Sequence, residues 1–448
     1  MNGVRRPLIV ILLVGLVVRL GALWLVLPTK PLLDERDYYF RAAHLAEDKA
    51  ILAEGKRAPA SIWYYAAFLK TFGAEPTVAR VANVLASWAA IPIVWGLGRR
   101  FGGDRVGLAA ALGVALYPNL VFFSFSLWSE SLYLPLALGS VLLLAEDRPP
   151  PARSLLAGML MGGAALTREV GVVLPVIGGL WILGRSHFRG ARAFAGAVLL
   201  GVGFAAVVLP WSLRQNRHSD SFALVTHTRW MNLYLGNVRF PETKTRTESM
   251  PPWDRYERLG KSLAEREAAA RPLARQAIVD RMPWWPLEKT AETLPRLLTP
   301  NSFPVARWLA RPDEKGWRGA RAYRARIDGT PLERLRPVFA YAAVGAWIVV
   351  LPAGLVGIVL AWRRPLSRLF VLYLALHVLP VIVTFGMSRF RLPLVPILVI
   401  AAASLFGSVR TSWAEAGAVR RSVASASALA AAIVVATQWK TILVPWWG

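Results

Sequence analysis

The sequence predicts an all-α polytopic membrane protein with about eleven transmembrane helices, and two observations support this fold class. First, 55% of the 448 residues are hydrophobic and only 18% are charged, whereas an ordinary soluble domain has about 25% charged residues. Second, the apolar residues fall in long runs separated by short arginine-containing segments, which is typical of loops between membrane spans. The net charge of +26 does not indicate nucleic-acid binding, because such a domain would be less apolar. The chain has no cysteine, which excludes disulfides, thiol catalysis and zinc–thiolate sites.

The individual spans are predicted from apolar windows of about 20 residues. They lie near 7–27, 78–98, 106–121, 128–145, 154–166, 170–184, 191–211, 337–361, 366–386, 391–408 and 422–438. The first has a basic start but exceeds a signal-peptide core of roughly 7–15 residues, and no A-x-A cleavage site follows. We therefore expect a retained first span. The apolar stretch from Pro59 to Phe72 is too short to span and is predicted to be a helix at the membrane interface.

The arginines predict which side of the membrane each loop faces. With the N-terminus in the cytoplasm, the short inner loops carry pairs and triplets of arginine, whereas the short outer loops after the second span carry only Arg168, Arg389 and Arg391. This asymmetry satisfies the positive-inside rule. Residues 28–77 then form a long first outer loop. Three units are expected: an N-terminal transmembrane module (1–211), a mostly helical extracytoplasmic loop domain (212–336) and C-terminal transmembrane helices (337–448).

A cluster of acids, Asp34, Glu35 and Asp37, follows the first span. A structural explanation is available, because Asp34 is a good N-cap and acids in the first turn complement the helix dipole. On a helix, Asp34 and Asp37 share nearly the same face, whereas Glu35 lies about 100° away.

Two further acids, Glu130 and Glu169, are predicted at the outer ends of spans. Ionisable groups at a span boundary are costly, which makes them functional candidates. The structural alternatives are a helix-start acid for Glu130 and an ion pair between Arg168 and Glu169 that closes a tight turn.

Basic residues on the same side complement these acids. Arg389 and Arg391 depart from the positive-inside trend, and arginine is suited to bidentate recognition of phosphate. The alternative is contact with lipid headgroups. The other basic candidates of the outer face are Arg214, Arg217, His218, His227 and Arg229.

Carboxylates opposite arginines at an outer membrane surface suit transfer of a sugar from a polyprenyl phosphate. A carboxylate can take the proton of an acceptor hydroxyl that attacks C1 of the sugar. Arginines can stabilise the charge that develops on the departing phosphate. No nucleotide sugar is available outside the cell, so a lipid-linked donor is the reasonable substrate. The acids alone would equally fit a proton relay in a transporter.

Six segments resemble, in order, those of GT-C superfamily glycosyltransferases of the protein O-mannosyltransferase and lipid A aminoarabinose transferase kind, that is, glycosyltransferase family 39. The segment "DERDYY" resembles the acidic motif of the first outer loop. The stretch from Phe101 to Leu136 is similar to the third-and-fourth-span signature, with a Tyr-Pro turn followed by Ser-Glu. The remaining segments are "GGAALTREVGVVLP", "LPWSLRQN", "NLYLGN" and "SRFRLPLVP".

The resemblance implies a role for each matching residue. Asp34 would be the catalytic acid of the family, with Glu35 as its neighbour and Glu130 as the acid of the second loop. From the helical faces we then expect Asp34 to perform the chemistry and Glu35 to orient the base or bind a sugar hydroxyl. Asp37, the most dispensable of the three, would cap the helix or bind the acceptor. The donor-phosphate contacts would be among Arg168, Arg389 and Arg391. Acceptor or donor-sugar contacts would come from Asp37, Tyr38, Glu169, Arg214, His218, Asn232 and Asn237. Gln215 separates Arg214 from Asn216, which the family usually has adjacent.

The expected function is that of an inverting glycosyltransferase of the GT-C type in the cytoplasmic membrane, active on its outer face. It would move a hexose or pentose from a polyprenyl phosphate such as undecaprenyl phosphate to a hydroxyl of a lipid, glycan or protein. No cofactor is required, and no His-rich spacing supports a divalent metal near the first-loop acids. One alternative is an O-antigen-ligase-like transferase that uses a polyprenyl-diphosphate glycan at Arg214, Arg217, His218 and His227. Another is a lipid-linked sugar transporter or flippase, for which only Arg19 lies within a span.

Overall fold

The computed structural model describes residues 2–27, 30–31, 34–49, 55–146, 150–184, 190–217, 222–239, 252–300, 331–406 and 413–437. The regular structure of these residues is helical, without strands. The first half contains α1 (Asn2–Val26), α2 (Asp34–Ala46), α3 (Pro59–Phe72), α4 (Pro76–Gly102), α5 (Asp104–Leu116), α6 (Pro118–Phe125), α7 (Glu130–Leu144), α8 (Pro151–Thr167), the 3₁₀ helix η1 (Glu169–Val173), α9 (Leu174–Gly184) and α10 (Ala191–Asn216). The second half contains α11 (Arg229–Asn237), α12 (Pro252–Glu257), α13 (Leu263–Val279), α14 (Trp285–Leu298), α17 (Pro331–Leu360), α18 (Pro365–Val383), the 3₁₀ helix η2 (Ser388–Arg391), α19 (Val395–Ala403) and α21 (Ala418–Thr437).

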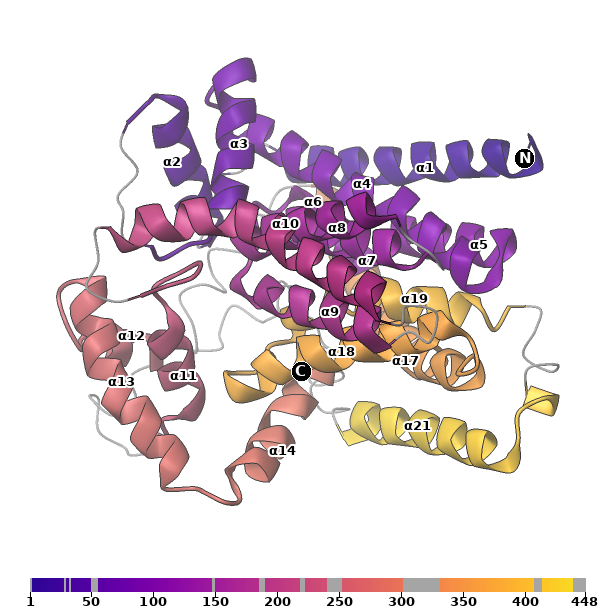
Figure 1. Ribbon diagram of the computed structural model, residues 1–448. Helices are drawn as coiled ribbons and strands as arrows, with labels where there is room; N and C mark the ends of the chain where they lie inside the picture. The colour runs from indigo at the N-terminus through magenta and orange to yellow at the C-terminus, as the bar shows by residue number, and fades with distance from the viewer. Residues whose placement is uncertain are drawn as a thin grey trace.

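Long apolar helices run side by side and form the body of the molecule (Figure 1). The described residues contain five helices that are long and apolar enough to cross a membrane: Val4–Val26, Pro76–Gly102, Ala191–Asn216, Val338–Leu360 and Pro365–Val383. A helix is present in each of the eleven ranges predicted to span, but several of these helices are short, such as α7 and α19. The protein is thus a multi-pass membrane protein, and the number of eleven spans stays a prediction.

The predicted span over 106–121 is a pair of helices that together are apolar and long enough for one span, but the pair is bent. The chain forms α5 and α6 there, bent by 53° with Tyr117 between them. Pro118 lacks a backbone N–H, and a residue before proline disfavours the helical conformation. Tyr117 accordingly has φ −62° and ψ 115°, and α6 begins at Pro118.

Arg19 fits into this bend. Its fully buried guanidinium donates to the backbone carbonyls of Ala115 (2.9 Å) and Val114 (3.2 Å), in the last turn of α5, and to the Ser87 hydroxyl (3.1 Å). The last carbonyls of a helix lack partners within the helix, and a cation there complements the helix dipole. These contacts explain a charge within the first span by structure alone and do not require a transport pathway.

The largest hydrophobic core contains side chains from α1, from α4 to α10, from α17 to α19 and from α21. A smaller cluster joins α2, α3 and α4, and includes Tyr38, Ile62 and Tyr65. Another joins α11, α12 and α13 through Tyr234, Tyr256 and Ala270. The helices α2 and α3, and likewise α11, α12 and α13, therefore pack around small cores separate from the largest one.

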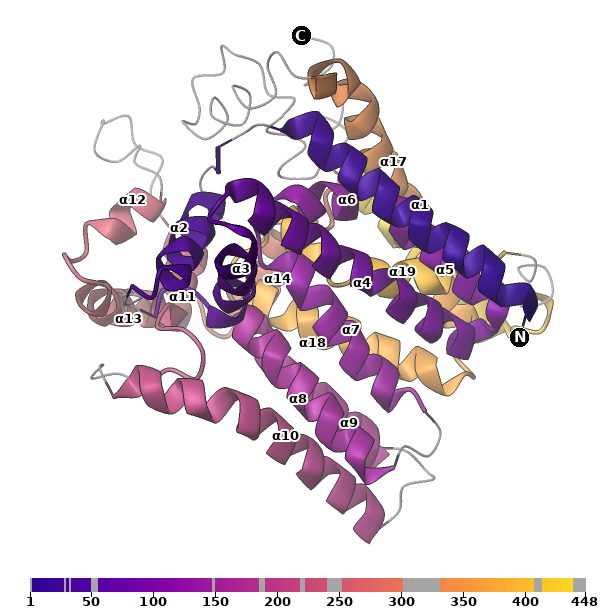
Figure 2. The same cartoon turned by 90° about the horizontal axis from the view of Figure 1, so that it is seen from above.

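The helices α2, α3, α11, α12 and α13 gather at the end of the bundle opposite the N-terminus (Figures 1 and 2). Helix α3 is the predicted interface helix and has the predicted bounds, Pro59–Phe72. It runs across the direction of α1 in both views, as an interface helix would. Described parts of the region 212–336 are mostly helical, as expected. Residues 240–251 and 301–330 lie outside the described residues.

Candidate functional site

Asp34 and Asp37 lie in the first turn of α2, where a three-residue spacing places both on one face. Arg57, just before α3, connects them. Its Nη2 donates to Asp34 Oδ1 at 2.8 Å and its Nε to Asp37 Oδ2 at 2.7 Å. Arg389 of η2 donates from Nη1 to Asp34 Oδ2 at 3.1 Å. The sequence segments 34–37, 57 and 389 thus meet at one carboxylate.

The arginines determine the ionisation of Asp34. Burial raises the pKa of a carboxyl group, but the charges and hydrogen bonds of Arg57 and Arg389 outweigh it, so the pKa of Asp34 lies well below its usual value. The side chain of Asp34 keeps 32% of its surface exposed. It is therefore an ionised, accessible carboxylate at the start of α2.

Glu130 and Arg168 form a second ion pair. Glu130 begins α7, and Arg168 follows the last residue of α8 in an extended conformation. Arg168 Nη1 lies 2.5 Å from Glu130 Oε1 and 3.1 Å from Ser129 Oγ. The alternative ion pair between Arg168 and Glu169 is wrong: Glu169 accepts instead from Thr226 Oγ1 at 2.8 Å.

Two aromatic rings contact the arginines of the ion pairs, and one of them, Phe390, contacts both arginines. The Arg389 guanidinium carbon lies 4.9 Å from the centroid of the Trp128 ring and 5.3 Å from that of Phe390. The Arg168 guanidinium carbon lies 5.8 Å from the same Phe390 ring. Such cation–π contacts hold a guanidinium in place. Arg168 and Arg389, both predicted to bind donor phosphate, are therefore neighbours.

The segment that carries Trp128 is held by Asn83, a fully buried residue of α4. Asn83 Nδ2 donates to the carbonyls of Phe123 (2.9 Å), Ser124 (2.9 Å) and Ser126 (2.6 Å). The Tyr65 hydroxyl is 2.7 Å from Asn83 Oδ1 and 3.1 Å from the Trp128 carbonyl. Phe123 and Ser124 lie in the last turn of α6 and Ser126 follows it, so Asn83 binds carbonyls that lack partners within the helix.

Glu35 points away from Asp34, as its helical position predicts. Its carboxylate is fully buried, accepts from the Leu127 N–H at 3.1 Å and lies 3.8 Å from Arg80 Nη2. These contacts fix α2 to the Trp128 segment. They favour a structural role over the predicted catalytic one.

Arg391 has different partners from Arg389. Its buried guanidinium donates to the carbonyls of Thr299 and Pro300 and lies 4.3 Å from the centroid of Trp347. The side chain thereby connects η2 to the end of α14 and to α17. These contacts favour a structural role, in place of the predicted phosphate contact.

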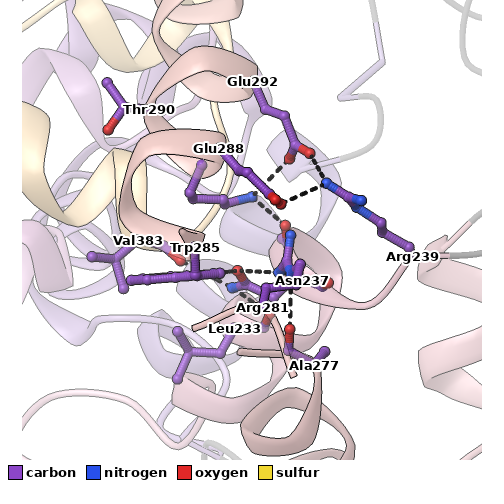
Figure 3. Close-up of polar contacts among 12 residues, drawn as sticks. Leu233, Asn237, Arg239, Ala277, Arg281, Trp285, Glu288, Thr290, Glu292 and Val383 are labelled. Atoms are coloured by element: carbon purple, nitrogen blue, oxygen red, sulfur yellow. Dashed lines mark hydrogen bonds and ion pairs between the residues drawn. The ribbon is translucent and has the colours of Figure 1, made fainter. Parts of the chain in front are cut away.

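Asn237, at the end of α11, is central to a polar network (Figure 3). Its Nδ2 donates to the carbonyls of Leu233 and Val383, each at 3.0 Å. Its Oδ1 accepts from Arg281 at 3.2 Å and from Trp285 Nε1 at 2.9 Å. This amide holds α11 against α14 and α18, which favours structure over the predicted sugar contact.

The other predicted residues are more scattered. Tyr38 lies under Arg57, 5.2 Å from its guanidinium carbon. Asn232 is a half-buried residue of α11, and Arg214 is exposed near the end of α10. Burial raises the pKa of Glu169, although its bond with Thr226 opposes this. His218 lies outside the described residues.

Sequence reasoning missed Arg57, Trp128 and Phe390. The sequence does not single out Arg57, because residues 28–77 also carry Lys30, Arg36, Arg41, Lys49, Lys56 and Lys70. The aromatic residues give no signal either. Among the described residues, no group of three or more His, Asp or Glu side chains is arranged to hold a metal ion.

Comparisons with known proteins agree with this architecture. Residues 56–211 match the family model of dolichyl-phosphate-mannose-protein mannosyltransferases. The fold matches the Archaeoglobus fulgidus oligosaccharyltransferase in complex with zinc and sulfate, with a TM-score of 0.52 and 14% identity over 96% of this chain and 52% of the other. It also matches the oligosaccharyltransferase AglB of the same organism with an inhibitory peptide and a dolichol-phosphate, with a TM-score of 0.51 and 13% identity over 99% of this chain and 56% of the other.

The chain therefore spans about half the length of the solved structures that it matches. No curated protein matches it in sequence. The match over residues 56–211 includes Arg57, Glu130 and Arg168 of the site. The resemblance is thereby confirmed as to fold: the protein shares the fold of these archaeal oligosaccharyltransferases, and its residues 56–211 match the family model of dolichyl-phosphate-mannose-protein mannosyltransferases.

Proposed function

We propose that the protein is an inverting glycosyltransferase that moves a sugar from a polyprenyl-phosphate donor to a hydroxyl acceptor. The observation that supports this most is the Asp34 carboxylate, accessible and bound to Arg57 and Arg389, with Arg168 beside Arg389 across the Phe390 ring. A proton acceptor and two phosphate-binding groups are thus close together. The matching family is described by a dolichyl-phosphate donor, and one solved relative contains a dolichol-phosphate.

In the proposed reaction, the acceptor oxygen attacks C1 of the sugar while Asp34 takes the hydroxyl proton. The bond between C1 and the phosphate oxygen breaks, and its electron pair leaves with the polyprenyl phosphate. Arg168 and Arg389 bind the phosphate and stabilise its growing charge. A single displacement inverts the configuration at C1.

The remaining groups would bind and position. Arg57 orients Asp34, and Glu130 orients Arg168 through their ion pair. Asp37, Tyr38, Glu169 and Asn232 remain candidates for contacts with the sugars. The proposed setting is the cytoplasmic membrane with the N-terminus inside, so that the site, at the opposite end of the bundle, faces outward (Figure 1). No step of this reaction requires a metal.

The proposal is tested by transfer of radiolabelled sugar from synthetic polyprenyl-phosphate donors in purified membranes. We expect Asp34→Asn to abolish transfer and to retain donor binding. Asp48→Asn is the matched control, because Asp48 is an exposed outer-loop acid whose partner is Lys70. If Asp34→Asn stays fully active while Arg214→Ala or His218→Ala is inactive, the ligase-like alternative is correct and this site assignment is wrong.

A further inference from the structure

We propose that the donor phosphate and Asp34 compete for Arg389, so that donor binding releases the carboxylate that accepts the acceptor's proton. This inference rests on the proposed function and concerns the order of events at the same site. It follows from the unequal ways in which two arginines hold Asp34.

Arg57 holds the acids firmly. It bridges Asp34 and Asp37 with two hydrogen bonds of 2.8 and 2.7 Å. The contact of Arg389 with Asp34 is longer, 3.1 Å, and uses the other carboxylate oxygen. Arg389 is therefore the partner that a competing anion removes at lower cost, and Arg57 keeps Asp34 in position after the exchange.

The aromatic contacts allow Arg389 to change partner without moving far. Its guanidinium lies against Trp128 and Phe390, and contacts with ring faces do not use its N–H donors. A phosphate offers several oxygens to the fork of a guanidinium. Arg168 contacts the Phe390 ring as well and would bind the same phosphate.

The exchange has a chemical consequence. While Arg389 is paired with Asp34, the carboxylate is a weak base, because the arginines hold its pKa low. A phosphate that takes Arg389 removes one stabilising charge and adds a negative one nearby, and both changes strengthen the base. Asp34 then takes the proton of the acceptor hydroxyl only when a donor is bound, so that the acceptor oxygen can attack C1 of its sugar.

The test measures binding of farnesyl phosphate, a short polyprenyl monophosphate, to the full chain in nanodiscs, with farnesol as the probe that lacks phosphate. We expect Asp34→Asn to tighten binding of farnesyl phosphate about fivefold, or ~1 kcal/mol, because the variant no longer competes for Arg389. Binding of farnesol should stay the same. Asp34→Ser should tighten binding similarly, which guards against an effect peculiar to asparagine.

Two comparisons separate exchange from general repulsion between carboxylates and phosphate. Asp37→Asn removes an equal charge that is bound to Arg57 and Arg41, and it should change the affinity less than twofold. In the Arg389→Ala background, Asp34→Asn should likewise change it less than twofold.

Three results would overturn the inference. Affinity that is unchanged or weaker in Asp34→Asn would show that Asp34 orients Arg389 for the phosphate. Equal tightening in Asp34→Asn and Asp37→Asn would show repulsion without exchange. If the unsubstituted protein binds farnesyl phosphate no better than farnesol, the proposed function fails too, whereas the first two results leave that function intact.

Discussion

Replacement of Asn83 by leucine tests whether the buried amide builds the site. The two side chains have the same number of heavy atoms and the same branching at Cγ, so the substitution removes polar contacts without leaving a cavity. The amide makes three hydrogen bonds of 2.6 to 2.9 Å to the carbonyls of Phe123, Ser124 and Ser126 and accepts one from Tyr65. The Phe123 carbonyl keeps the Ser131 hydroxyl as a donor and the Ser126 carbonyl keeps the Trp128 N–H, so the main cost is the Ser124 carbonyl, at about 1–3 kcal/mol.

The expected loss of stability is about 2–4 kcal/mol, because one carbonyl loses its donor, the other hydrogen bonds of the network are reduced, and the leucine side chain regains some apolar contact. The stability would be measured as the Tm of the purified protein in nanodiscs. Tyr65→Phe is the control: it removes one hydroxyl of the same network and should cost about 1 kcal/mol.

A positioning role requires more than a lower Tm. The Asn83 bonds hold the segment that places Trp128 against Arg389, so Asn83→Leu should raise the KM for the lipid donor at temperatures well below its Tm. The reasoning would be refuted if Asn83→Leu kept the Tm of the unsubstituted protein. A reduced Tm with an unchanged KM would refute the positioning role alone.

Three other predictions follow from the described contacts. Glu35→Ala removes the carboxylate that pairs with the buried Arg80 charge and should destabilise the protein by about 3–5 kcal/mol. The loss would be measured as a lower Tm and yield, and an unchanged Tm would contradict a buried ion pair. If Asp34 is the base, kcat/KM should stay constant from pH 7 to about pH 5, because a base acts while deprotonated and the pKa of Asp34 is low. If kcat/KM instead falls over this range and Glu169→Gln removes the fall, the base is Glu169, whose pKa is raised by burial. Asn237→Ala should speed hydrogen exchange in α11 and leave the KM for donor unchanged, and the reverse result would restore its predicted sugar contact.

The sequence by itself determined the class of the protein and much of its local structure. Apolar runs predict helices because a backbone in lipid must satisfy its own hydrogen bonds. The bounds of α3 follow from Pro59, which suits the first turn, and from Gly73, whose φ of 102° ends the helix. The faces of Asp34 and Glu35 follow from the helical period. The bend at Tyr117 was not predicted, since a hydropathy window averages over one proline.

Only the tertiary structure decided which charges meet. Arg389 and Arg391 are two residues apart and look alike in the sequence, yet one reaches Asp34 and the other binds backbone carbonyls. Likewise, Arg168 pairs with Glu130 and not with its neighbour Glu169. Hydropathy is a property of each segment, whereas an ion pair depends on where separate segments pack. For this reason the fold could be predicted from composition and period, and the partners of each arginine required the assembled chain.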